Sequence, residues 1–165
     1  MPSMSNQTDD NKAWRFCHTE KVRFADVDMF DHVNNAAYLT YVESARVAYY
    51  SNVTGLQDPH EFDMTVARAE IDFKKPAFYP ATINIFTRAT RIGNKSWTLE
   101  HELRDASNSD LLAHCATIIV HFDHETGKSK PIPPHIVSLI EAYEGRPLKE
   151  PTPGGSSPPG PLPGQ

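Results

Sequence analysis

The stretch Val22-Arg-Phe-Ala-Asp26-Val-Asp28-Met-Phe-Asp31-His32-Val-Asn-Asn35 decides how this chain folds and where its chemistry lies. It begins as the end of a strand-like run, in which apolar and polar residues alternate. It then carries three carboxylates, Asp26, Asp28 and Asp31, and next to the last of them His32. Because an apolar helical segment follows at once, we expect these side chains to lie at a helix N-terminus. There the backbone N–H groups lack partners and the helix dipole favours negative charge.

The apolar segment runs from residue 36 to about residue 52 and is predicted to be one long helix. The charged residues in its body are Glu43 and Arg46, which are i, i+3 neighbours and can pair. A helix that is apolar on most sides is a buried helix. Gly55 follows as a C-terminal stop signal. The rest of the chain is therefore expected to wrap around this helix.

The remaining chain alternates as strands do, and short turns join its consecutive strands. Strands are predicted at 13–25, 64–73, 82–91, 97–104 and 111–122, with a closing helix at 135–143. The near-continuous apolar run at 116–120 predicts a strand covered on both faces. Short connections favour an antiparallel sheet of about five strands, so the predicted class is α+β. The exposed edges of such a sheet favour a homodimer or homotetramer.

Length and charge restrict the classes of function. With 165 residues and a net charge of −5, the chain is expected to form one domain without a nucleic-acid-binding face. No apolar stretch approaches the roughly 18 residues that span a membrane. A polar N-terminus argues against a secretory signal. Cys17 and Cys115 lie far apart and are interpreted as buried, reduced thiols, so we expect a cytoplasmic protein.

Composition also divides the chain into three parts. Residues 1–12 carry no apolar periodicity and are expected to be disordered. Residues 13–146 hold the predicted domain. Residues 147–165 are rich in Pro, Gly and Ser, which predicts a flexible tail.

Two interpretations of the three carboxylates come first, namely helix capping and metal binding. Asp and Asn residues cap helices, and a cap alone stabilises a helix by about 1 kcal/mol. Three acids, however, exceed what a cap needs. The pair Asp26 and Asp28 after a strand also resembles the nucleophile motif of haloacid-dehalogenase-type phosphatases, which bind magnesium. That interpretation requires a parallel α/β sheet, whereas the pattern here predicts an antiparallel one.

In a third interpretation, the sequence around the carboxylates matches a family signature residue by residue. The run from Arg23 to Arg46, RFADVDMFDHVNNAAYLTYVESAR, closely resembles the signature of the 4-hydroxybenzoyl-CoA thioesterase family of hotdog-fold proteins. The segments 71–77, 90–96 and 102–105 resemble later motifs of the same family, so the resemblance covers roughly residues 14–145. It implies a hotdog fold, in which an antiparallel sheet curls around one long helix. It also implies acyl-CoA thioesterase activity.

The resemblance assigns the catalytic carboxylate to Asp28. An aspartate at this position can deprotonate water or attack the thioester directly, while helix N–H groups stabilise the oxyanion. His32, Asn34 and Asn35 are expected to bind substrate, and capping of the helix is the alternative role of His32 and Asn34. Tyr38 and Tyr41 are expected in the core or in the wall of the acyl pocket.

The basic turn after the predicted strand at 82–91 supplies the candidate residues that bind the CoA phosphates. Arg91, Lys95 and Ser96 lie there, although a solvated turn explains the same residues. The family usually has Gly where this chain has Asp31. Gly permits positive φ, whereas Asp tolerates it but adds bulk and charge. This departure leaves the identity of the substrate open.

The resulting hypothesis is an Asp28-dependent acyl-CoA thioesterase. It uses no metal and no cofactor other than the coenzyme A of its substrate. Acyl carrier protein is an alternative carrier of the acyl group, because both carriers share the pantetheine arm. The alternative class is a hotdog protein that binds acyl-CoA or acyl carriers without turnover. A hotdog dehydratase is disfavoured, since no matching His-centred motif is found.

Overall fold

The computed structural model describes residues 14–149. The predicted disordered segment 1–12 and the part of the predicted tail from residue 150 onward lie outside the described residues. Within them the elements follow the predicted order closely. They are β1 (Phe16–Lys21), a 3-10 turn η2 (Phe24–Asp26), α1 (Asn35–Thr54), a 3-10 turn η3 (Pro59–Glu61), β2 (Met64–Phe73), β3 (Thr82–Ile92), β4 (Ser96–Asp105), β5 (Leu111–Asp123), β6 (Lys128–Ser129) and α2 (Pro134–Glu144).

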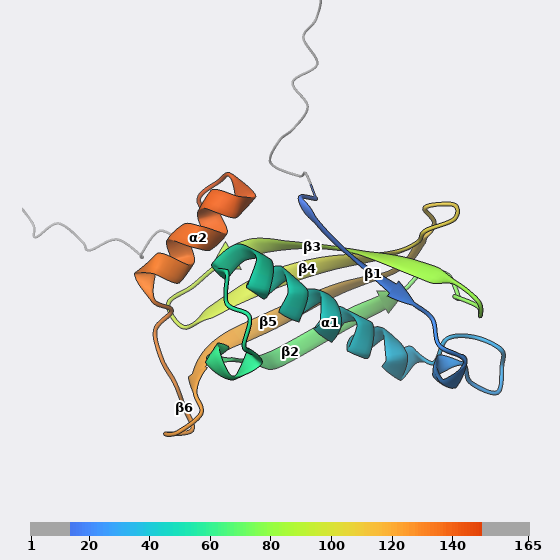
Figure 1. The fold of residues 1–165 in the computed structure, drawn as a ribbon, viewed down its shortest axis with the longest axis horizontal. Coiled ribbons are helices and arrows are strands. Elements are labelled where there is room, and N and C mark those ends of the chain that lie inside the picture. Colours follow the sequence, from blue (N-terminus) through green and yellow to red (C-terminus); the bar gives the residue numbers. More distant parts are fainter. Residues whose placement is uncertain (1–13, 150–165) are drawn as a thin grey trace, which may run out of the picture.

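The strands form one antiparallel sheet in the order β1-β3-β4-β5-β2, and the short β6 pairs with β5. Helix α1 lies across one face of this sheet, and α2 packs near its C-terminal end (Figure 1). The predicted α+β class and five-stranded antiparallel sheet are confirmed. Because the main sheet is antiparallel, the phosphatase interpretation of the two aspartates loses its structural basis.

Capping residues mark both ends of helix α1. The Asn34 side chain accepts a hydrogen bond from the Ala36 N–H at 2.9 Å, which satisfies one of the unpaired donors of the first turn. Gly55 ends the helix in the left-handed conformation, with φ of 78°. The predicted stop signal is confirmed. Tyr38, Tyr41 and Tyr49 are among the helix residues that are buried.

The core has two clusters, one under each half of α1. Tyr41 and Leu103 belong to the cluster at the N-terminal half. Tyr49, Trp97 and Ile140 belong to the cluster at the C-terminal half, where α2 completes the packing. Burying these large side chains contributes about 1.5–3 kcal/mol each. The helix is thereby held firmly along its length, so its N-terminus has a fixed place relative to the sheet.

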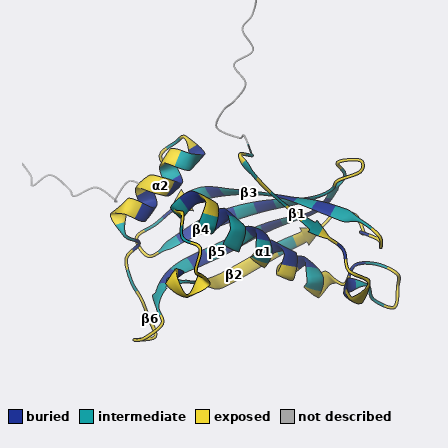
Figure 2. Ribbon diagram, in the orientation of Figure 1, coloured by how far each residue is buried: buried dark blue, intermediate teal, exposed yellow. Residues whose placement is uncertain are grey.

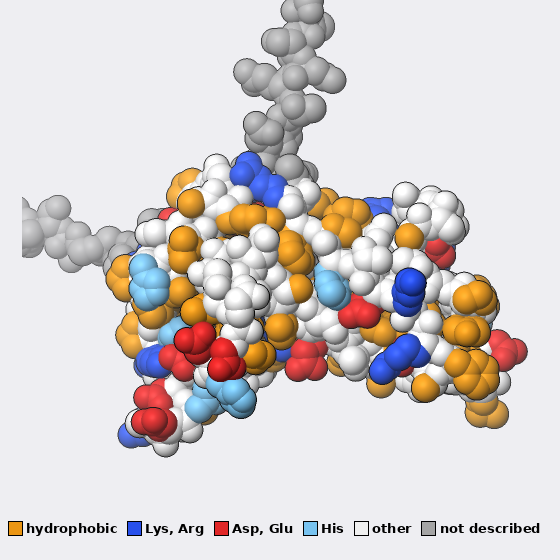
Figure 3. Space-filling model, viewed as in Figure 1, with side chains coloured by type: hydrophobic (Ala, Val, Ile, Leu, Met, Phe, Trp, Pro, Cys, Tyr) orange, Lys and Arg blue, Asp and Glu red, His pale blue; other side chains and the backbone are white. Residues whose placement is uncertain are grey.

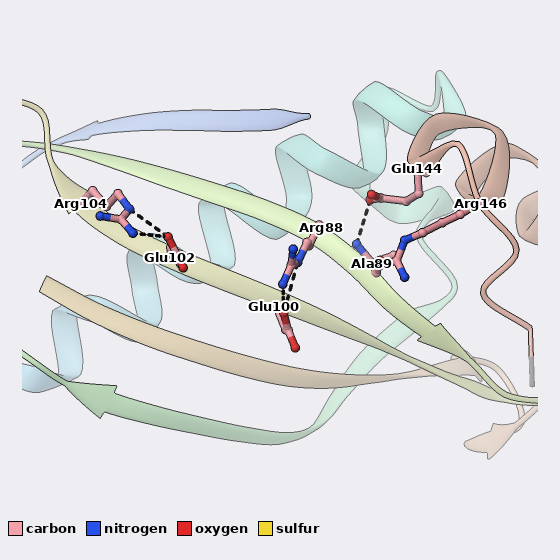
Figure 4. A network of polar contacts seen from close by, with 7 residues as sticks. All are labelled: Arg88, Ala89, Glu100, Glu102, Arg104, Glu144 and Arg146. Atoms are coloured by element: carbon pink, nitrogen blue, oxygen red, sulfur yellow. Dashed lines mark hydrogen bonds and ion pairs between the residues drawn. The ribbon is translucent and has the colours of Figure 1, made fainter. Parts of the chain in front are cut away.

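The outer face of the sheet is not covered by any described element. Along β5 buried residues alternate with half-buried ones (Figure 2). The prediction that β5 is covered on both faces is therefore wrong for residues 14–149, because both described helices pack against the inner face of the sheet. On the outer face Arg88 pairs with Glu100 and Arg104 with Glu102, each at 2.7 Å (Figure 4).

Glu144 ties α2 to an irregularity in β3. The register of β3 against β4 shifts between Ala89 and Arg91. The buried Glu144 carboxylate accepts a hydrogen bond from the Ala89 N–H at 2.8 Å, and Arg146 donates to the Ala89 carbonyl at 3.2 Å (Figure 4). Tyr49 of α1 donates to the same carboxylate at 2.5 Å. One carboxylate therefore joins α1, α2 and the sheet.

Two further findings modify the expectations. Leu148, assigned from sequence to the tail, is buried, and its carbonyl accepts a hydrogen bond from the Ile92 N–H at 2.9 Å. The core therefore includes Leu148, which lies beyond the predicted domain bound of residue 146. Both cysteines are free, but only Cys115 is buried, whereas Cys17 is exposed on the edge strand β1.

None of the helices among residues 14–149 is both long and apolar enough to span a membrane.

Candidate active site

The loop between η2 and α1 is a small closed turn that presents Asp28. Val27 and Val33 form an antiparallel bridge at its base. Above this bridge the Asp28 N–H donates to the His32 carbonyl at 2.9 Å, and the Asp31 N–H donates to the Asp28 carbonyl at 3.1 Å. The backbone hydrogen bonds of the loop thus hold Asp28 in one position relative to the helix.

Asp31 occupies the turn position that the family usually gives to Gly. Its φ is 62°, which lies in the left-handed region that Asp tolerates better than most residues. Its side chain is exposed. The departure from the family pattern is therefore compatible with the backbone, and the extra charge faces solvent.

Asp26 is the buried anchor of the loop. Its carboxylate accepts hydrogen bonds from the Arg23 backbone and guanidinium at 2.7–3.1 Å and from the Tyr41 hydroxyl at 2.6 Å. Its carbonyl accepts from the Asn34 N–H at 2.7 Å. The Arg23 side chain is the main cause that lowers the pKa of Asp26 to about 2, with Tyr41 adding to the effect. Tyr41 is accordingly a core residue that holds Asp26.

Asp28 lines a hollow between the loop, α1 and the end of β2, which we call the reactive hollow. Its volume is ≈ 430 Å³. It is lined by Asp28, Phe30, His32, Val33, Asn35, Tyr38, Phe73, Lys74, Lys75 and Pro76. One Asp28 carboxylate oxygen accepts a hydrogen bond from the Phe30 N–H at 2.8 Å. Among residues 14–149 nothing donates to the other oxygen, so it is available to water or substrate.

The first turn of α1 borders this hollow through Asn35 and Tyr38. The Ala36 N–H is taken by the Asn34 side chain, and the Ala37 N–H donates to the Asn34 carbonyl at 2.9 Å. In the described part of the chain the Asn35 N–H has no acceptor. Asn34 therefore caps the helix, as one of its two expected roles, while Asn35, with its unpaired N–H, is among the residues that line the reactive hollow.

Two other expected residues reach the hollow. The His32 ring packs edge to face against Phe78, with centroids 5.2 Å apart, and remains half-buried. Tyr38 is buried, and burial raises the pKa of its hydroxyl. The structure thus brings Asp28, His32, Asn35 and Tyr38 together at one hollow.

Sequence reasoning did not single out Lys74 and Lys75, which follow β2 directly and line the reactive hollow. Lys75 pairs with Asp110 at 2.8 Å, and Lys74 lies 3.7 Å from Asp72. Two lysines before a proline were visible in the sequence. Their proximity to the carboxylates could not be predicted, because the lysines lie about forty residues further along the chain. Only the tertiary fold brings the end of β2 to the loop.

Apolar side chains also gather at this end of the molecule (Figure 3). Phe24, Met29 and Phe30 of the loop region are 77%, 87% and 69% exposed. Such a concentration of exposed apolar surface marks a region that contacts other molecules.

The residues expected to bind CoA phosphates lie elsewhere. Arg91, Lys95 and Ser96 lie at the hairpin between β3 and β4, at the end of the sheet near α2 (Figure 1). The loop that carries Asp28 lies at the opposite end. Within one chain the structure does not bring these residues to the reactive hollow. Among residues 14–149 there is also no group of three His, Cys, Asp or Glu side chains that suits a metal ion.

The comparisons with known proteins point to one family. A family model described as the thioesterase-like superfamily matches residues 22–140. The long-chain acyl-CoA thioesterase FadM of Escherichia coli (strain K12) is 27% identical over 111 residues, which cover 66% of this chain and 84% of FadM.

Solved structures agree with that match. A thioesterase from Thermus thermophilus, complexed with coenzyme A and Zn, is 31% identical with a TM-score of 0.74, covering 83% of this chain and 99% of that one. A 1,4-dihydroxy-2-naphthoyl-CoA thioesterase from Synechocystis is 22% identical with a TM-score of 0.68, covering 76% and 94%. At that identity the second likeness concerns the fold alone.

Proposed function

Since the chain belongs to the thioesterase-like superfamily and has its hotdog fold, we propose that Asp28 is the group with which this thioester hydrolase cleaves acyl-CoA. The observation that carries the proposal is the pairing of two unsatisfied groups at one hollow. They are the free oxygen of the Asp28 carboxylate and the free N–H of Asn35, the first residue of α1.

The reaction needs these two groups at the thioester. The Asn35 N–H, at the positive end of the helix dipole, stabilises the negative charge that develops on the carbonyl oxygen. Asp28 either takes a proton from the attacking water or attacks the carbonyl itself to form an acyl–enzyme anhydride that water then cleaves. In both routes the C–S bond breaks, the thiolate leaves and takes a proton, and the free acid forms. The mechanism uses no metal and no cofactor beyond the coenzyme A of the substrate.

The test is Asp28→Asn in a thiol-release assay. We expect hydrolysis to fall at least a hundredfold, with the melting temperature unchanged. Asp31→Asn is the matched control, because it makes the same chemical change three residues away on an exposed side chain. Full activity of Asp28→Asn would refute the mechanism. Acyl-CoA binding in a thermal-shift assay without thiol release by the wild type would instead favour an acyl-binding protein.

The acyl group and its carrier are a further part of the proposal. The sequence resemblance to the 4-hydroxybenzoyl-CoA thioesterase family supports including aromatic acyl groups in the screen, next to short and long chains. FadM, which is similar to this chain, supports CoA as the carrier. Acyl carrier protein substrates belong in the same screen. The two free cysteines support a reducing, cytoplasmic setting.

We also propose that β2 joins two copies of the chain. Its outer edge has no strand partner among residues 14–149, and most of its ten residues are exposed. Such an edge favours pairing with another strand. A second copy would also offer Arg91, Lys95 and Ser96 to the CoA bound by the first, which one chain alone does not do.

Sedimentation velocity tests this arrangement. Ala67 lies at the register shift of β2, where the hydrogen bonding to β5 is already interrupted. Ala67→Pro should therefore block pairing to a second copy with little damage to the sheet, and we expect the dimer to become a monomer. A wild type that sediments as a monomer would contradict the proposal.

A further inference from the structure

A second hollow lies between α1 and β2, further along both elements, and its lining includes Leu39 and Val66, which are 43% and 38% exposed. This inner hollow has a volume of ≈ 210 Å³. It is lined by Leu39, Val42, Glu43, Arg46, Val66, Ala69 and Thr117. Both hollows lie between α1 and β2, yet they share no lining residue. On both elements the residues that line the inner hollow end before those that line the reactive hollow begin.

At this boundary stand Tyr38 of α1 and Phe73 of β2, which both line the reactive hollow, and we call their contact the partition. Their rings meet edge to face, with centroids 5.2 Å apart and planes at 84°. Tyr38 is 2% exposed and is held by the core, whereas Phe73, the last residue of β2, is 43% exposed. Phe73 is therefore the side of the partition that can be removed without opening the core.

The inner hollow suits an unbranched hydrocarbon chain. Leu39, Val42, Val66 and Ala69 give it an apolar lining. Its far end is polar, because Arg46 lies there with its guanidinium 3.6 Å from the Glu43 carboxylate. From Tyr38 to Arg46 the helix rises about 12 Å. That length accommodates about nine methylene groups of an extended chain.

We propose that the Tyr38–Phe73 contact sets the length of the acyl group that this protein accepts. With the partition closed, the acyl group has only the reactive hollow, which suits short or aromatic acyl groups. With the partition open, an unbranched chain of about ten carbons extends into the inner hollow. This inference rests on the proposed function, since it assumes that the thioester is cleaved beside Asp28.

The experiment compares butyryl-CoA with decanoyl-CoA in the full-length protein. The wild type should favour butyryl-CoA, and Phe73→Ala should raise the ratio of kcat/KM for decanoyl-CoA over butyryl-CoA at least tenfold. Phe78→Ala is the matched control, because Phe78 is similarly exposed at 53% but contacts His32 outside the partition. In that variant the ratio should stay at the wild-type value.

A second variant tests where the longer chain goes. Ala69 is exposed on β2 and lines the inner hollow, so Ala69→Trp can fill that hollow without entering the core. In the Phe73→Ala background it should abolish the gain on decanoyl-CoA and leave butyryl-CoA hydrolysis unchanged.

The outcomes separate the two proposals. If butyryl-CoA is cleaved but Phe73→Ala leaves the ratio unchanged, the partition inference fails and the proposed function stands. The inference also fails if the wild type cleaves both esters equally well. If the wild type cleaves no acyl-CoA of any length, the proposed function fails and the inference falls with it.

Discussion

Asp26→Asn should destabilise the protein because it removes the negative charge that binds Arg23 and Tyr41 in the loop before α1. The Asp26 carboxylate is 6% exposed and accepts hydrogen bonds from Arg23 and Tyr41. Its pKa is about 2, below the ordinary 3.8. Since a tenfold change in an equilibrium corresponds to about 1.4 kcal/mol, this difference amounts to about 2.4 kcal/mol. The Arg23 side chain is 68% exposed, so water screens the pair and we expect about 1–2 kcal/mol.

The effect should depend on pH with a definite sign. The pKa of Asp26 is lower in the folded than in the unfolded state, so its contribution is complete above about pH 5. The contribution is lost as the pH falls from about 4 towards 2. The difference in free energy of unfolding between wild type and Asp26→Asn should therefore shrink over that range. Groups that titrate equally in both proteins cancel in the difference.

Urea unfolding at pH 7, 5, 4 and 3 measures this difference. Asp31→Asn is the control, since Asn tolerates the left-handed φ of 62° and the side chain is exposed. It should change stability by less than about 0.5 kcal/mol. The reasoning is refuted if Asp26→Asn matches the wild type at pH 7. It is also refuted if the loss at pH 3 equals the loss at pH 7.

Two other buried polar groups lead to predictions of the same kind. Tyr49→Phe removes a donor from the buried Glu144 carboxylate and should cost about 1–3 kcal/mol in urea unfolding. Tyr143→Phe, whose hydroxyl bonds an exposed carbonyl, should cost less, and equal losses would contradict this account. Burial, aided by the charge of Arg46, lowers the pKa of His101 to about 3. Below pH 6.5 the imidazole therefore binds a proton in the unfolded state but stays neutral in the folded state. Stability should fall from pH 6.5 to 4 by up to about 1.4 kcal/mol per pH unit, and less in His101→Gln; an unchanged slope in that variant would refute the assignment.

The order and type of the elements could be predicted because they depend on local pattern. The alternation at 64–73 and the helical spacing after Asn35 are properties of neighbouring residues, and both elements formed as expected. The errors came from tertiary context. The run at 116–120 suggested two covered faces, yet no helix among residues 14–149 covers the outer face of the sheet. Leu148 lies in a stretch whose composition resembles a tail, but its side chain completes the core.

The sequence by itself determined that three carboxylates precede a buried helix, because caps, turns and apolar periodicity act over a few residues. Their different roles were decided only by the tertiary structure. Burial beside Tyr41 makes Asp26 an anchor, Asp31 lies exposed at a turn with positive φ, and the end of β2 lines a hollow together with Asp28. These differences depend on contacts between residues far apart in the chain. Such contacts exist only once the sheet has brought β2 to the N-terminus of α1.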